Sequence, residues 1–92
     1  MSLTRRLVIH GRVQGVFYRA WSLAEATSLG LRGWVRNRSD GSVEMLLHGN
    51  EADVTRMIAL CQEGPPAARV DQVDVEQADE PVPSAFEKRP TL

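Results

Sequence analysis

Cysteine is nearly absent from this sequence of 92 residues, since Cys61 is the only one. A single cysteine forms no intramolecular disulfide and supplies too few thiolates for a zinc cage, which excludes a disulfide scaffold and a zinc finger. The chain therefore depends on a hydrophobic core, and its length suits one domain, residues 1–92. Its 42% hydrophobic and 25% charged residues are typical of a globular protein rather than a disordered one.

Long apolar runs are missing as well. A membrane helix needs about 18 consecutive apolar residues, whereas the run Leu7-Val8-Ile9 ends at His10. That run follows Arg5 and Arg6, but it is shorter than the roughly 7–15 apolar residues of an export signal. We therefore expect no membrane segment and, with a lone cysteine, a cytoplasmic location.

Acidic residues are scarce in the first part of the chain, and this scarcity gives the sequence an uneven charge. Residues 1–38 contain seven arginines and one acid, a net charge of +6, while residues 39–92 contain four bases and eleven acids, a net charge of −7. All the bases except Lys88 are arginine, whose planar guanidinium suits phosphate or carboxylate groups. Most of these arginines are interpreted as solubilising residues, but the asymmetry favours an anionic ligand for the N-terminal part.

Apolar periodicity and turn residues predict six elements in the order strand, helix, strand, strand, helix, strand. Gly30 is placed to end the first helix, Asp40-Gly41 to form a hairpin turn, and Asn50 to cap the second helix. The expected elements are residues 6–12, 20–29, 31–38, 42–49, the segment between Asn50 and Gly64, and residues 69–77.

This order predicts an α+β, ferredoxin-like split βαβ sandwich, with two helices on one face of an antiparallel sheet of four strands. A fifth strand in the tail, residues 84–92, is left open because Phe86 favours it whereas Lys88 and Pro90 oppose it. In this topology the hairpin's second strand lies between the first two strands, which run parallel. The loop after residue 12 and the end of the strand at Asn37 are then expected at the same sheet edge, about 10 Å apart.

The predicted first helix lacks a capping residue. No Ser, Thr, Asp or Asn occurs from Arg12 to Trp21, so its first N–H groups need another partner, either water or an anion. Arg19 lies at the junction of loop and helix and favours the anion. No Gly-Lys-Ser/Thr follows Gly15, so the loop is not a nucleotide-binding P-loop.

Two segments resemble the signatures of the acylphosphatase family. Residues 11–19, GRVQGVFYR, match G-x-V-Q-G-V-x-[FY]-R, and residues 33–43, GWVRNRSDGSV, match G-[FYW]-V-x-N-x-x-D-G-x-V at every fixed position. The resemblance covers residues 5 to 77 and implies a small enzyme that hydrolyses carboxyl–phosphate anhydrides.

The resemblance also implies roles for individual residues. Arg19 and the N–H groups of the loop would bind the phosphate, and Asn37 would position the attacking water. Neither a metal nor another cofactor is implied. The chemistry fits because an acyl phosphate has a good leaving group, so hydrolysis needs positioning and charge stabilisation more than a strong general acid. The loop residues are Gln14, Gly15, Val16, Phe17, Tyr18 and Arg19.

The other conspicuous residues are given structural roles. His10 and His48 lack a third ligand for a metal, and Cys61 falls on the apolar stripe of the second helix. Trp21 and Trp34 are expected in the core, with Trp34 also a candidate to line the site. Phe17 and Tyr18 are expected to pack beneath the loop.

Three alternatives compete with a freestanding acylphosphatase. An RNA-recognition module is disfavoured because residues 6–12 and 42–49 contain no aromatic side chain for stacking. An acylphosphatase-like segment of a hydrogenase-maturation carbamoyltransferase normally belongs to a far longer chain. A catalytically weak member could instead serve a protein partner. We favour a monomer whose ligands are a small acyl phosphate and inorganic phosphate or a similar anion, without nucleic acid or membrane partners.

Overall fold

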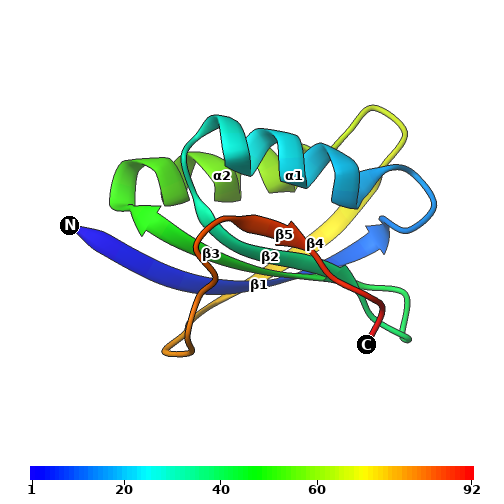
Figure 1. Ribbon diagram of the computed structural model, residues 1–92. Coiled ribbons are helices and arrows are strands. Elements are labelled where there is room, and N and C mark those ends of the chain that lie inside the picture. The colour runs from blue at the N-terminus through cyan, green and yellow to red at the C-terminus, as the bar shows by residue number, and fades with distance from the viewer.

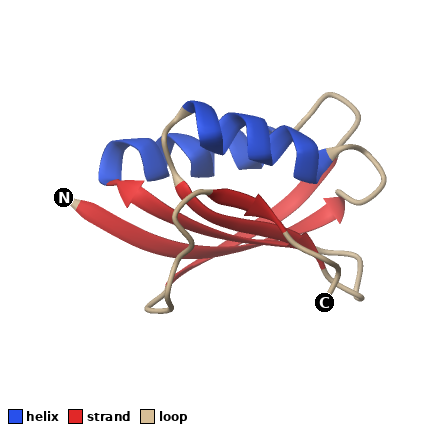
Figure 2. Ribbon diagram, in the orientation of Figure 1, coloured by secondary structure: helices blue, strands red, loops and turns tan.

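Five strands form one sheet in the computed structural model, which describes residues 1–92. The sheet order is β4-β1-β3-β2-β5, and both helices lie on the same face, leaving the other face open (Figure 1, Figure 2). This is the predicted ferredoxin-like sandwich. The elements are β1 (Ser2–Arg12), α1 (Tyr18–Ser28), β2 (Arg32–Asn37), β3 (Val43–Asn50), α2 (Glu51–Glu63), β4 (Arg69–Gln77) and β5 (Phe86–Lys88).

The central strand is β3, which pairs antiparallel with both β1 and β2, so that β1 and β2 run parallel as predicted. Gly33 permits the close approach of β2 to β3. Its φ is 140°, and a Cβ there would overlap the carbonyl of Leu46. The topology therefore brings the end of β1 and the end of β2 to one edge of the sheet, with only β3 between them.

The tail forms the fifth strand, and this strand makes the sheet mixed rather than wholly antiparallel. β5 pairs parallel with β2, and the pairing continues beyond it through N–H groups of Arg89 and Leu92, which donate to the carbonyls of Val35 and Asn37. Pro90 lies between these two donors on an edge strand, where alternate N–H groups face away from the neighbour, so its missing N–H breaks no ladder bond.

The core lies between the sheet and the helices and includes Val43, Met45 and Leu47 as predicted. The opposite face of β3 is more buried than its mixed sequence indicates, since Leu46 is fully buried. Leu46 lies opposite Trp34 in the sheet register. Trp34 is buried, but on the open face, because its neighbour Val35 enters the core and strand side chains alternate.

The helix ends follow the sequence signals closely. Gly30 has a φ of 72° and follows the last turn of α1, and the Asn50 side chain accepts a hydrogen bond from the Ala52 N–H at 2.9 Å. α1 begins two residues earlier than predicted, at Tyr18, and β1 begins at Ser2 because its pairing with β3 extends to Asn50. Neither helix combines the length and apolar character needed to cross a membrane.

Candidate active site

The segment joining β1 to α1 has an unusual backbone. Gly15 has a φ of 72°, and Phe17, the residue before α1, has a φ of 65° and a ψ of 23°. A left-handed conformation is uncommon for a residue other than glycine and is enriched at functional sites. No side chain caps α1, as the sequence predicted.

The backbone N–H groups from Gln14 to Tyr18 donate no hydrogen bond within the protein. Alternation of right- and left-handed residues turns successive N–H groups toward one concave side, a geometry that binds anions. The positive end of the α1 dipole adds to the attraction. We call this segment, residues 14–18, the phosphate loop, after the role that the sequence resemblance implies for it.

Tyr18 anchors the phosphate loop to the rest of the molecule. Its side chain is 1% exposed, and its hydroxyl donates to the carbonyl of Cys61 at 2.6 Å. That carbonyl has no donor in α2, because the residue four positions later is Pro65. Burial raises the pKa of Tyr18 far above its ordinary value, which keeps the hydroxyl a donor. Tyr18 thus joins the start of α1 to the end of α2.

The side chain of Phe17 points to solvent, unlike those of its neighbours Val16 and Tyr18. The expectation that it packs beneath the loop is wrong, since it is 81% exposed at the rim. Its left-handed backbone turns the side chain outward while Val16 and Tyr18 point into the core.

Gln14 holds the phosphate loop against the β2–β3 hairpin. Its side-chain nitrogen donates to the carbonyl of Arg38 at 2.7 Å and to that of Ser42 at 2.8 Å. Sequence reasoning assigned Gln14 only a backbone role. The bridge fixes the loop relative to Asn37, which immediately precedes the hairpin turn.

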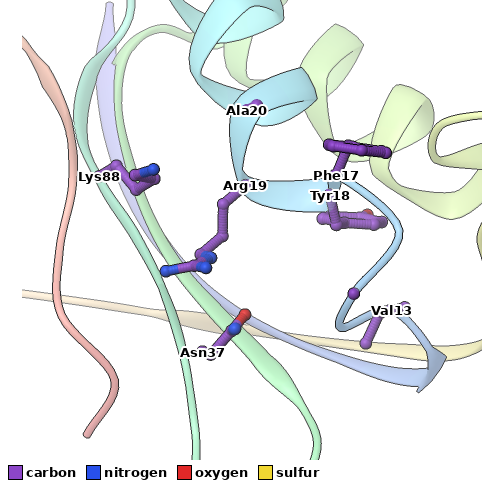
Figure 3. A pocket seen from close by; sticks show the side chains of 8 residues that line it. Val13, Phe17, Tyr18, Arg19, Ala20, Asn37 and Lys88 are labelled. Atoms are coloured by element: carbon purple, nitrogen blue, oxygen red, sulfur yellow. The ribbon is translucent and has the colours of Figure 1, made fainter.

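A pocket of about 270 Å³ opens where the loop, α1, β2 and β5 meet. Arg19 and Asn37 project into it from α1 and β2 (Figure 3). The two residues predicted from separate motifs therefore meet in one cavity. The lining residues are Val13, Gly15, Phe17, Tyr18, Arg19, Ala20, Asn37 and Lys88.

Both polar side chains are uncommitted within the protein. Arg19 takes part in none of the ion pairs. The side-chain oxygen of Asn37 is buried and accepts no hydrogen bond. Buried polar atoms ordinarily have a partner, so this oxygen is free to accept a hydrogen bond from a water or ligand that reaches it.

Lys88 lies in the same pocket, which the sequence did not reveal. In the sequence, Lys88 stands out only as a residue that opposes a fifth strand. Arg19 and Lys88 are both cationic, and no carboxylate lines the pocket. Together with the free N–H groups, these charges favour an anion and stabilise negative charge that develops on it.

The other candidate residues lie outside the pocket. His10 contacts Asp74 at 3.0 Å and His48 contacts Thr4 at 2.8 Å, and no cluster of His, Cys, Asp and Glu side chains is suited to a metal ion. Cys61 is fully buried as predicted, and burial raises the pKa of its thiol to about 12. Trp34 does not line the pocket; Arg36 and Arg89 lie over its ring, at 4.6 and 5.2 Å.

Comparisons with known proteins agree with the two sequence signatures. A family model described as Acylphosphatase matches residues 5–88. The chain is 53% identical over 95 residues to Acylphosphatase 2 of Ralstonia nicotianae, covering 100% of both chains.

Solved structures give the same result for the fold. The structure of an acylphosphatase from Coxiella burnetii is similar with a TM-score of 0.91 and 34% identity, covering 96% of this chain and 93% of that one. Full-length HypF, in a phosphate- and nucleotide-bound form, is similar with a TM-score of 0.89 and 27% identity. This second match covers 99% of the present chain but 12% of HypF, so the fold also occurs within longer proteins.

Proposed function

The chain belongs to the acylphosphatase family, hydrolases that act on acyl phosphates, and we propose that the phosphate loop, Arg19 and Asn37 carry out this reaction. The observation that supports the proposal most strongly is the convergence of free N–H donors, an unpaired guanidinium and an unpaired amide oxygen on one pocket. Water also satisfies exposed N–H groups, but the cationic side chains of Arg19 and Lys88 beside them favour an anion.

The phosphoryl group would bind in the phosphate loop. Its oxygens accept from the N–H groups of residues 14–18, and the Arg19 guanidinium reaches the same oxygens from α1. Negative charge on the equatorial oxygens changes during phosphoryl transfer, and fixed donors can favour the transition state over the substrate. Fixed N–H groups also need no reorganisation as the reaction proceeds.

Asn37 would hold the attacking water. An amide oxygen is not a base at neutral pH, but it accepts a hydrogen bond and so fixes the position of the water. The buried Oδ1 of Asn37 has no competing partner in the protein. The gain comes from proximity and orientation, which convert a bimolecular attack into an effectively unimolecular step.

The reaction balances without an additional acid or base. Water attacks phosphorus, the bond from phosphorus to the bridging oxygen breaks, and its electron pair stays on the leaving carboxylate. Both protons of the water remain on the phosphate product, so an acyl phosphate dianion gives a carboxylate and dihydrogen phosphate. This matches a pocket that is lined by no Asp, Glu or His.

Steady-state hydrolysis of benzoyl phosphate tests the assignment of Arg19. We expect turnover that EDTA leaves unchanged, and Arg19→Ala should lower kcat/KM by at least about 10²-fold, as for the loss of one preorganised donor. Arg56→Ala is the matched control, because Arg56 is an exposed residue of α2 outside the pocket. Near-full activity of Arg19→Ala would contradict the assignment.

We also propose that residues 1–92 act as a single acylphosphatase-like domain, as a monomer and in the cytoplasm. The support for a single domain is the one hydrophobic core that lies between the sheet and both helices, and the free thiol of Cys61 suits a reducing compartment.

A further inference from the structure

A second cation shares the pocket with Arg19. Lys88 is the last residue of β5, and side chains alternate along a strand. Phe86 enters the core on the helix side, so Lys88 also projects to that side, whereas Arg89 lies over Trp34 on the open face. Figure 3 shows the Lys88 side chain on the wall opposite the phosphate loop, with the Arg19 guanidinium between Lys88 and Asn37.

Lys88 is not engaged elsewhere in the protein. It takes part in none of the ion pairs, and its neighbour Glu87 pairs instead with Arg89 at 3.3 Å. No Asp or Glu lines the pocket to neutralise it. The ammonium group is therefore available to a ligand.

The position of Lys88 in the sheet separates it from the phosphate loop. The loop follows β1, Asn37 ends β2, and β5 is the strand beyond β2 in the order β4-β1-β3-β2-β5. Three strand spacings separate the axes of β1 and β5, about 14 Å. For a phosphoryl group bound in the loop, the guanidinium of Arg19 would be the nearer cation, and Lys88 lies across the pocket from the loop.

We propose that Lys88 binds a negative charge on the acyl group, so that this enzyme prefers acyl phosphates that carry a second anionic group over those with a neutral acyl chain. The inference rests on the proposed function, since it assumes that the phosphoryl end occupies the loop. A dianionic phosphoryl group is matched by Arg19, the N–H groups and the helix dipole. The positive charge of Lys88 is then available to bind an anionic group on the acyl part of the substrate.

The test compares two rigid substrates that differ only in one carboxylate, benzoyl phosphate and 3-carboxybenzoyl phosphate. The readout is the ratio of their kcat/KM values, because intrinsic reactivity cancels when the ratio is compared between variants. Lys88→Met should lower this preference for the carboxylated substrate by about two- to fivefold, the effect of one exposed charge pair. Lys88→Arg should keep the preference, and added salt should weaken it in the wild type.

Arg89→Met is the matched control, because it removes one positive charge from the adjacent position on the other face of the sheet. It should keep the wild-type ratio. An unchanged ratio in Lys88→Met, or an equal fall in Arg89→Met, would overturn the inference. If the wild type hydrolyses neither compound, the proposed function itself fails and the inference falls with it. If both compounds are hydrolysed but Lys88→Met leaves the ratio of their kcat/KM values unchanged, only the role of Lys88 is contradicted and the proposed function stands.

Discussion

The side-chain nitrogen of Gln14 donates a hydrogen bond to the carbonyl of Arg38 at 2.7 Å, and so ties the phosphate loop to the hairpin that follows Asn37. A second bond from the same nitrogen reaches the carbonyl of Ser42 at 2.8 Å. Gln14 lies 24 residues from Arg38 and 28 residues from Ser42 in the sequence, so these hydrogen bonds join the two distant segments that form the pocket. One side chain thus sets the distance between the groups proposed to bind phosphate and the group proposed to hold water.

Replacing Gln14 should affect geometry more than stability. The carbonyls of Arg38 and Ser42 keep backbone donors, Gly41 and Arg38 respectively, so Gln14→Ala should cost only about 1–2 kcal/mol of unfolding free energy. The misplaced loop should lower kcat/KM for benzoyl phosphate by about tenfold or more.

Urea unfolding and steady-state kinetics measure the two effects of Gln14→Ala. Gln72→Ala is the matched control, because the Gln72 side chain bonds only to Asp74 on the exposed edge of the sheet. Full activity in Gln14→Ala would contradict a positioning role for this side chain.

Asn37→Ala should slow catalysis without weakening substrate binding or lowering the stability of the protein. Loss of the oxygen that orients the water should lower kcat by about 10²-fold or more while KM changes little, since the phosphoryl group is bound by other residues. The buried Oδ1 makes no hydrogen bond within the protein, so its removal should not lower Tm. Kinetics and thermal unfolding of the purified variant check both statements. A kcat near that of the wild type, or a Tm well below it, would show that Asn37 has a different role.

Tyr18→Phe should destabilise the protein without removing any group that binds phosphate. The Tyr18 hydroxyl is the donor to the Cys61 carbonyl, which Pro65 leaves without a partner in α2. An unpaired buried carbonyl costs about 1–3 kcal/mol, and for a domain of this size each kcal/mol lowers Tm by roughly 4–8 °C. Differential scanning calorimetry measures the shift. An unchanged Tm would mean that water replaces the hydroxyl at the Cys61 carbonyl.

Asp40 should make stability depend on pH in the acid range. Its carboxylate accepts hydrogen bonds from the hydroxyl of Ser42 at 2.6 Å and from its N–H at 2.9 Å, and these bonds hold the pKa of Asp40 below its usual value. A carboxyl whose pKa is lower in the folded state stabilises the protein above the unfolded pKa, about 3.9. That stabilisation is lost as the pH falls from there through the folded pKa.

Unfolding in urea between pH 5 and pH 2 measures this dependence for the wild type and for Asp40→Asn. The variant keeps an acceptor for Ser42 but does not titrate, so it should lose less stability across the interval. Asp71 and Asp74, whose pKa values are also lowered, are present in both proteins and cancel in the comparison. Identical curves would contradict a contribution from Asp40.

Most of the fold could be predicted from local signals in the sequence. Gly30 and Asn50 fixed helix ends because left-handed glycine and side-chain capping are local effects, and alternation placed Val43, Met45 and Leu47 in the core. What the sequence left short or open involves tertiary pairing. β1 extends to Ser2 only because β3 continues to Asn50, and the tail forms β5 because β2 offers a free edge beside a buried Phe86.

The sequence predicted the site residues that belong to a motif. It did not predict contacts that arise only from the tertiary fold. Arg19 and Asn37 were predicted to meet because two parallel strands with one strand between them end at the same sheet edge. Lys88 was missed because its place in the pocket depends on a fifth strand, which Pro90 disfavours in the sequence. The hydrogen bonds from Gln14 were missed because their acceptors are backbone carbonyls of a distant turn, and every residue type has such a carbonyl.

Hydrolysis of benzoyl phosphate in ¹⁸O-labelled water tests the central claim most directly, because it reports which atom the water attacks. With phosphate held in the loop and water held by Asn37, attack occurs at phosphorus, and mass spectrometry should find one ¹⁸O in inorganic phosphate and none in benzoate. Label in the benzoate would mean that water attacks the carbonyl carbon. It would contradict the roles proposed for the phosphate loop, Arg19 and Asn37.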